Sequence, residues 1–247
     1  MPFKNISAGT AALFLSFIMV QPAYAIDKVY SPNVTKGELE VEYSGSTTFD
    51  GNHDKRNLEG HEVELEYGIA DRIMLELAGS FQKLPDENVK SDGVGLGGRY
   101  QFFEQGEHWL DAGILLSYGK ATQGGDPDGI EAKLLLEKQT GEFLHRANIG
   151  IEQEVGSHAS GGPDRVILWN SRYRYDAHFE PGFEIQSDFG QANETHGNYN
   201  KQEHYIGPAA FGQIIPNLKY EAAYYFGVSD AASTGAARVL LEYEMFF

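Results

Sequence analysis

The stretch Glu62-Val63-Glu64-Leu65-Glu66-Tyr67 decides the fold, because acidic and apolar residues alternate in it without a break. The same pattern occurs at Glu38-Leu39-Glu40-Val41-Glu42-Tyr43. Successive side chains of a β-strand point to opposite faces, so each stretch presents one acidic face and one apolar face. A soluble amphipathic strand has the same local pattern. The choice between a soluble and a membrane sheet therefore depends on how many such segments there are and how they are connected.

Alternating segments follow one another from these two stretches to the C terminus, with no convincing helical period between them. Their lengths suit tilted membrane strands, which need about 9–11 residues, better than globular strands, which average about 5–6. We predict twelve strands at residues 37–49, 58–69, 72–83, 90–103, 108–121, 130–138, 143–155, 165–175, 179–190, 202–212, 218–227 and 236–247.

The connections between the predicted strands alternate between short and long. The second and third strands are separated by a tight turn near Asp71, whereas the first and second are joined by a polar loop over residues 50–57. Outer-membrane barrels have short periplasmic turns and longer extracellular loops. An even number of strands also closes a barrel without an exposed edge, as lipid requires. The sequence therefore predicts an all-β, transmembrane, antiparallel up-and-down β-barrel of about twelve strands.

The N-terminal residues have the features of a secretory signal peptide. Lys4 gives a basic start, residues 11–20 are apolar, and Ala23-Tyr24-Ala25 is an A-x-A cleavage site. The apolar run is too short for a transmembrane helix, which needs about 20 residues. We expect residues 1–25 to be a signal peptide cleaved after Ala25, and residues 26–247 to be an outer-membrane barrel. The chain has no cysteine, so disulfides and thiolate metal sites are excluded.

The last strand has a second export-related signal. Every other residue is apolar up to the terminal aromatic residue, a pattern similar to the signature that outer-membrane proteins present to the barrel-assembly machinery. The expected assembly signal consists of Val239, Leu241, Tyr243, Met245 and Phe247. Expected partners are therefore this machinery, outer-membrane lipid and lipopolysaccharide, and small solutes.

With the apolar set facing lipid, the polar set would line the lumen. The predicted acidic lining is Glu38, Glu40, Glu42, Glu62, Glu64, Glu66, Glu76, Glu242 and Glu244, on strands that are contiguous in a closed barrel. The predicted basic lining is Arg99, Arg172, Arg174, Lys219 and Arg238, with Arg172 and Arg174 facing the acidic wall and Arg238 among Glu242, Glu40 and their neighbours. Facing walls of opposite sign would set up a field across a pore.

The net charge of −17 argues against a nucleic-acid partner, which needs a basic surface. These features favour a passive, cation-preferring channel for small solutes. Two alternatives stay open. One is a structural or surface-binding barrel with a plugged lumen. The other is a lipid-modifying enzyme using His204 and Ser187 on adjacent predicted strands. No catalytic motif, metal site or cofactor site is predicted, and we expect no enzyme activity.

The hairpin from Glu62 to Leu77, with Tyr67-Gly68 before the turn and Asp71-Arg72 in it, resembles one family of barrels. These are the bacterial outer-membrane proteins described as putative transporters of the meta-pathway of phenol degradation. The resemblance covers about a tenth of the chain and implies a channel or transporter, with small organic or aromatic compounds as the expected solutes.

Overall fold

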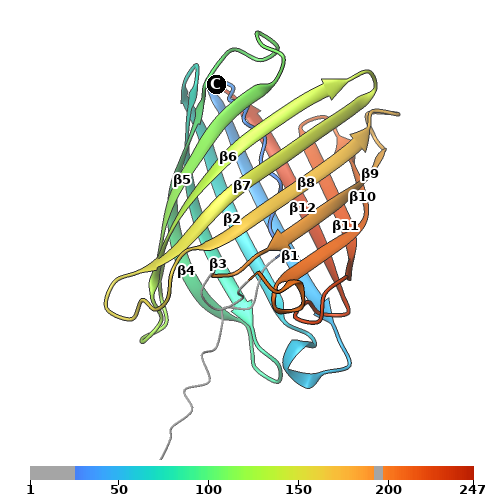
Figure 1. Ribbon diagram of the computed structural model, residues 1–247. Helices are drawn as coiled ribbons and strands as arrows, with labels where there is room; N and C mark the ends of the chain where they lie inside the picture. Colours follow the sequence, from blue (N-terminus) through green and yellow to red (C-terminus); the bar gives the residue numbers. More distant parts are fainter. Residues whose placement is uncertain (1–25, 192–196) are drawn as a thin grey trace, which may run out of the picture.

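The computed structural model describes residues 26–191 and 197–247 (Figure 1). The predicted signal peptide and its cleavage site lie outside the described residues. Twelve antiparallel strands form one closed barrel, which confirms the predicted fold class. The strands are β1 (Glu38–Phe49), β2 (Glu59–Ala70), β3 (Ile73–Lys83), β4 (Lys90–Gln101), β5 (Asp111–Ala121), β6 (Asp128–Thr140), β7 (Phe143–Val155), β8 (Asp164–Tyr173), β9 (Glu180–Asp188), β10 (Glu203–Ile215), β11 (Leu218–Gly227) and β12 (Gly235–Phe246), with short 3-10 turns η1 (His53–Lys55) and η2 (Tyr199–Lys201) in two loops.

The barrel closes where the first strand meets the last. Glu40 of β1 lies opposite Glu244 of β12 on one side and opposite Glu66 of β2 on the other. Every strand is thus paired along both sides, and none presents a row of free N–H and C=O groups to lipid. The same register puts the acidic face of three neighbouring strands on one inner wall.

Tight turns and longer loops sort to opposite ends of the barrel, as predicted. β6 and β7 are joined at Gly141, and β10 and β11 at Asn217; these residues have φ of 58° and 69°. The left-handed region favours glycine and tolerates asparagine, which explains their presence in these turns. The longer loops, including the one with η1, gather at the opposite end (Figure 1). We call the two ends the turn end and the loop end.

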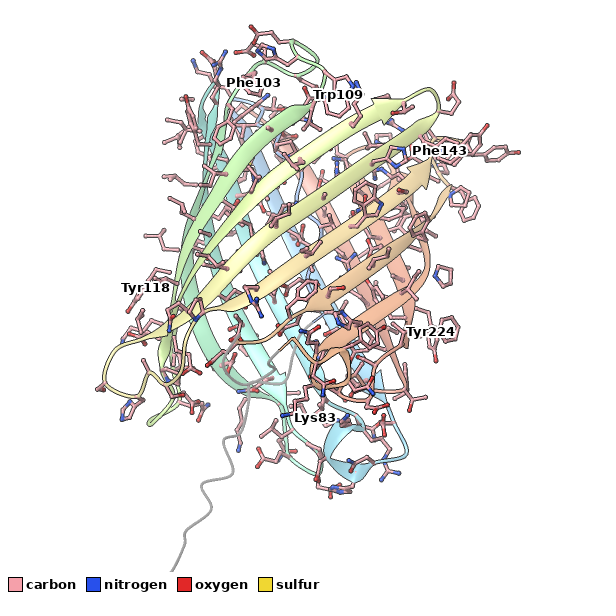
Figure 2. All side chains as sticks on the ribbon, viewed as in Figure 1. Lys83, Phe103, Trp109, Tyr118, Phe143 and Tyr224 are labelled. Atoms are coloured by element: carbon pink, nitrogen blue, oxygen red, sulfur yellow. The ribbon has the colours of Figure 1, made fainter. Side chains whose placement is uncertain are left out.

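The outer face of the barrel exposes large apolar side chains along every part of its wall. Leu77, Leu96 and Leu116, on β3, β4 and β5, are 55%, 62% and 54% exposed. Figure 2 shows Phe103, Trp109 and Phe143 at the turn end, and Tyr118 and Tyr224 toward the loop end. An apolar band bordered by aromatic residues is the surface of a barrel that spans a bilayer. No helix among the described residues is long and apolar enough to cross a membrane.

The C-terminal strand presents its apolar set outward. Val239, Leu241 and Tyr243 are 48%, 37% and 42% exposed, while Arg238 and Leu240, which alternate with them and face inward, are buried. The chain end is tied to the start of β1 by the Phe247 N–H, which donates to the Gly37 carbonyl at 2.9 Å. The terminal aromatic residue is thus held at the turn end. Its use as an assembly signal stays a prediction.

Candidate functional site

The lumen is crossed by the chain segment that precedes the first strand. We call residues 26–36 the strap. Its side chains and backbone contact β1 and β2 through Lys28, β4 through Val34, β7 through Tyr30 and β9 through Asp27. These strands stand on different sides of the closed barrel, so the strap runs through the interior. The alternation within the strands does not predict this course.

The backbone of the strap is held by carboxamide side chains that project inward from the wall. Gln186 of β9 accepts from the Asp27 N–H at 3.2 Å and donates to the Asp27 carbonyl at 2.6 Å. Asn148 of β7 pairs with Tyr30 in the same way, at 2.7 and 3.0 Å. These amides therefore supply the hydrogen bonds that a neighbouring strand would otherwise provide.

Lys28 places the charge of the strap against the acidic wall. Its ammonium lies 2.9 Å from Glu42, 2.5 Å from Glu64 and 2.8 Å from Glu66. All four side chains are almost fully buried. Buried carboxylates this close to one another need a counter-charge, and Lys28 provides it. The strap therefore supplies the positive charge that compensates the buried carboxylates of the wall.

A second cation on the wall completes this cluster. Arg99 of β4 is buried and its guanidinium lies 2.7 Å from Glu66 and 2.9 Å from Glu76. Tyr30 of the strap packs between the two cations, with Lys28 Nζ 4.4 Å and Arg99 Cζ 5.5 Å from its ring centroid. Cations over an aromatic face are attracted by its electrons. The predicted lumen residues Glu42, Glu64, Glu66, Glu76 and Arg99 are thus brought together around Lys28 and Tyr30.

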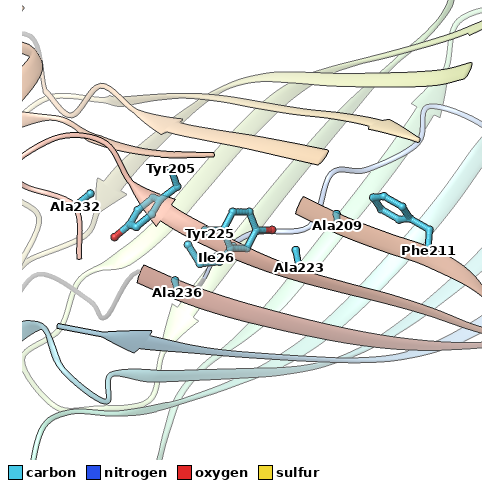
Figure 3. Packing of buried hydrophobic residues seen from close by; sticks show 8 residues of the cluster. All are labelled: Ile26, Tyr205, Ala209, Phe211, Ala223, Tyr225, Ala232 and Ala236. Atoms are coloured by element: carbon cyan, nitrogen blue, oxygen red, sulfur yellow. The ribbon is translucent and has the colours of Figure 1, made fainter. Parts of the chain in front are cut away.

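The first described residue of the strap packs into an apolar layer nearer the loop end. Ile26 contacts the cluster that includes Tyr205, Tyr225 and Ala236 (Figure 3). Ile26 is 6% exposed, and Tyr225 and Ala236 are 0% exposed. The lumen is therefore filled at this level by side chains from the strap and from β10, β11 and β12.

Arg238 is at the centre of a separate ion cluster beside this layer. Its Nη2 lies 2.9 Å from Glu184 of β9 and 3.1 Å from Glu221 of β11, and the Tyr225 hydroxyl also donates to Glu184. The prediction that Arg238 lies among Glu242 and Glu40 is wrong. Arg238 is opposite Ser46 on β1, far along the strand from Glu40, so the carboxylates of β9 and β11 are its partners.

Between the strap and the turn end lies a cavity of about 390 Å³, which we call the vestibule. Gln105, Ala177 and Gln213, which lie in or beside the turns, form part of its lining. The cavity thus extends from the strap to the rim of the barrel. Its charged lining contains most of the remaining predicted residues: Glu38, Glu40, Glu242, Glu244, Arg172, Arg174 and Lys219.

The vestibule residues are partly paired with one another. Lys219 lies 3.0 Å from Glu242 and also contacts Glu244. Arg174, whose side chain is half exposed just beyond β8, lies 2.6 Å from Glu180. Glu62, which sits on the same face of β2 as Glu64, is the one predicted acidic residue placed toward the loop end, opposite Ser44 and Ser80. The alternation thus found the inward-facing residues but not their partners.

The pair considered for catalysis does not form a catalytic arrangement. His204 and Ser187 are opposite each other in the β9–β10 register. Within the described part of the chain, however, the His204 ring nitrogen bonds Gln202 Oε1 at 3.1 Å, and the ring stacks on Tyr199. These contacts leave the imidazole directed at an amide rather than at a nucleophile.

Comparison with solved structures agrees with this architecture. The COG4313 outer membrane channel from Pseudomonas putida F1 superposes with a TM-score of 0.63, 12% identity and coverage of 90% of this chain and 100% of that chain. The fold is therefore that of a twelve-stranded porin barrel.

Two further porins show the same likeness. The KdgM porin gives a TM-score of 0.59 with 9% identity over 84% of this chain and 99% of that chain. The NanC porin gives 0.55 with 10% identity over 84% and 99%. No family model and no curated protein matches the sequence. At these identities the likeness concerns the fold, and the resemblance to the phenol-pathway transporters stays a hypothesis.

Proposed function

We propose that the protein is a passive outer-membrane channel for small polar solutes, and that the strap sets the width of its passage. The observation that carries this proposal is the strap itself: a single segment, held by side-chain amides and by Lys28, crosses the lumen. A porin barrel with a polar interior is suited to conduct water and solutes. The segment that narrows it is the element that regulates how much passes.

The attachment of the strap suits such a role. At the turn end it is fixed, because the Gly37 N–H donates to the Gly68 carbonyl at 2.8 Å and the chain continues into β1. With the expected cleavage after Ala25, its other end would be a free N terminus within the lumen. A segment tethered at one end and held by hydrogen bonds can leave its groove without breaking the barrel wall, whose ladder is complete without it.

The lumen charges support a preference for cations. Nine glutamates and six cations line the vestibule, and six of these glutamates lie on the neighbouring strands β1, β2 and β12. Carboxylates in excess over cations raise the local concentration of permeant cations in a pore. The solutes we expect are small and polar; small organic or aromatic compounds stay a hypothesis from the family resemblance.

A plugged barrel with a structural or surface-binding role is the second candidate. It is favoured by the three short contacts of Lys28, which would hold the strap tightly. This candidate predicts no solute flux, whereas a channel predicts flux that depends on the lumen charges. Catalysis is not part of the proposal, since the contacts of His204 do not prepare a nucleophile.

The test is single-channel recording of refolded residues 26–247 in a planar bilayer under a salt gradient. We expect discrete steps and a reversal potential on the cation side. Glu40→Gln, in the vestibule wall, should reduce this selectivity. Glu107→Gln, in an exposed turn between β4 and β5, is the matched control and should not. Folded protein that gives no steps would support the plugged barrel instead.

A further inference from the structure

The two sides of the vestibule carry opposite charge. On one side are Glu38, Glu40 and Glu244, from neighbouring strands β1 and β12. Their carboxylate oxygens approach within 4.8 Å of one another. On the other side are Arg146 of β7, Arg172 of β8 and Arg174 beyond the end of β8. Strands β7 and β8 are distant from β1 and β12 in the strand order of the closed barrel.

The basic side has more cations than carboxylate partners. Arg146 Nε lies 2.6 Å from Glu137, and Arg172 and Arg174 share Glu180 at 3.3 and 2.6 Å. Three guanidiniums thus share two carboxylates, since the nearby Glu221 is taken by Arg238. The 3.3 Å contact of Arg172 is close enough for an ion pair but is not directed as a hydrogen bond. Its buried Nε accordingly has no hydrogen-bond partner among the described residues.

The acidic side also has carboxylates that hydrogen bond to other side chains but are not paired with a cation. Lys219 contacts Glu242 and Glu244, and Lys28 is directed to Glu42, Glu64 and Glu66. No ion pair within the described residues involves Glu38 or Glu40. Glu42, which lines the same cavity and is 3% exposed, keeps its Oε1 without a hydrogen-bond partner in the described part of the chain. Buried polar atoms left in this way are stabilised by water or by a ligand.

We propose that the vestibule is a binding site for a small zwitterion, with its carboxylate at Arg172 and Arg146 and its ammonium group at Glu38, Glu40 and Glu244. This rests on the proposed channel function and names the class of solute that the channel selects. A guanidinium matches a carboxylate in both charge and geometry. A cavity of about 390 Å³ is at the small end of ligand pockets and accommodates a compact molecule with both groups.

The facing charges distinguish this site from a simple acidic patch. A monovalent cation would contact only the glutamates and leave the arginines without a counter-charge. A simple anion would contact only the arginines and leave the glutamates without one. A molecule with both groups uses both sides at once. Its binding free energy therefore contains two charge-assisted contributions, each typically worth a factor of ten or more in affinity.

The experiment measures binding, so that it does not depend on conduction. Folded residues 26–247 in detergent micelles are titrated with 4-aminobutyrate, butyrate and butylammonium, with saturation-transfer NMR as the readout. Protein-free micelles give the background. The variants are Arg172→Gln for the basic side and Glu40→Gln for the acidic side. Arg165→Gln is the matched control, because Arg165 also lies on β8 but is exposed at the loop end. Circular dichroism and gel mobility confirm the folding of each.

We expect 4-aminobutyrate to bind about tenfold more tightly than butyrate or butylammonium. In Arg172→Gln and in Glu40→Gln, this difference in affinity should be lost. The control should keep it. Equal binding of the three probes, binding of butylammonium alone, or retained selectivity in Arg172→Gln would overturn the proposal. If the zwitterion binds but the bilayer shows no flux, the binding site is supported and the channel function is contradicted. If the bilayer shows flux but the zwitterion is not preferred, the channel function is supported and the binding site is contradicted.

Discussion

Two regions of the lumen bury carboxylates next to a cation, but they obtain the cation differently. Around Glu184, the cation is Arg238, which belongs to the barrel strand β12. Around Glu64 and Glu66, the cation is Lys28, which belongs to the strap and not to the wall. The first cluster is built entirely from side chains of the barrel strands β9, β11 and β12. The second would lose its cation if the strap left the lumen. In the proposed function, one cluster therefore stabilises the wall and the other holds the strap in place.

The largest effect on stability is expected from removing the cation that belongs to the barrel wall. Arg238→Gln should lower the free energy of unfolding by about 3–5 kcal/mol, because it leaves Glu184 buried without its counter-charge. The measurement is urea unfolding in lipid vesicles. Arg165→Gln, the exposed arginine of β8, should change the free energy by less than about 0.5 kcal/mol. Equal stability of the two variants would show that the Arg238 cluster does not support the barrel.

Removing the cation of the strap should have a smaller effect on stability and a larger one on conduction. Lys28→Gln should cost about 1–2 kcal/mol, because the strap can leave and water can then solvate Glu42, Glu64 and Glu66. Single-channel conductance and cation selectivity should both rise. Lys36→Gln is the control, since Lys36 is exposed at the end of the strap and pairs with the exposed Asp71. A cost as large as that of Arg238→Gln, with unchanged conductance, would mean that the strap is a fixed part of the wall.

The space that the strap needs can be tested without changing any charge. A Cβ at Gly113 of β5 would lie 3.2 Å from Pro32 Cβ and 2.9 Å from the Tyr100 carbonyl oxygen, whereas a Cβ at Gly119 of the same strand would meet nothing within 4 Å. Gly113→Val should therefore displace the strap, at a cost of about 1–3 kcal/mol. Protease cleavage within the strap should become faster. Gly119→Val should leave the strap protected, and equal cleavage of both variants would contradict its course past Gly113.

The smallest effect is expected in the loops, where the charges are exposed. The carboxylate of Asp86 accepts a hydrogen bond from His53 at 2.7 Å, and it raises the pKa of His53 above its ordinary value. A raised pKa in the folded state adds stability that is complete below the ordinary pKa of about 6.5 and is lost as the pH rises through the raised value. The contact between these two loops should accordingly weaken in alkali.

NMR titration of the His53 ring protons measures this directly. In Asp86→Asn the pKa should move back toward the ordinary value, and the extra protection of the loop amides at low pH, relative to their intrinsic exchange rates, should be lost. A titration curve that is the same in both proteins would exclude Asp86 as the cause.

The barrel could be predicted because lipid contacts one face of each strand and the lumen contacts the other, so apolar and polar residues alternate along the strand. Leu65 and Leu77 face outward while Glu64, Glu66 and Glu76 face inward, and the strand count and the order of turns follow from the same alternation. The inward orientation of these glutamates therefore follows from the amino-acid sequence alone. Their partners do not, because the alternation of one strand does not say which residue of a distant strand, or of the strap, comes close to it.

The strap was missed because it has no period and no recognisable motif, although two signals for it were present. One is the excess of carboxylates on β1 and β2, which requires a cation from outside those strands. The other is the set of amides at inward positions, Gln101, Asn148 and Gln186, which need partners with both donors and acceptors. A backbone segment provides both kinds of group. Together these residues indicate that an extended segment of the chain lies inside the lumen.

The most direct test of the account is the single-channel conductance of a chain that begins after the strap, compared with that of the chain beginning at Ile26. Both are refolded and inserted into the same planar bilayer, and folding is confirmed independently. If the strap sets the width of the passage, the shortened protein should conduct severalfold more and should be more selective for cations, because Lys28 no longer neutralises Glu42, Glu64 and Glu66. Equal conductance of two folded proteins would contradict the account.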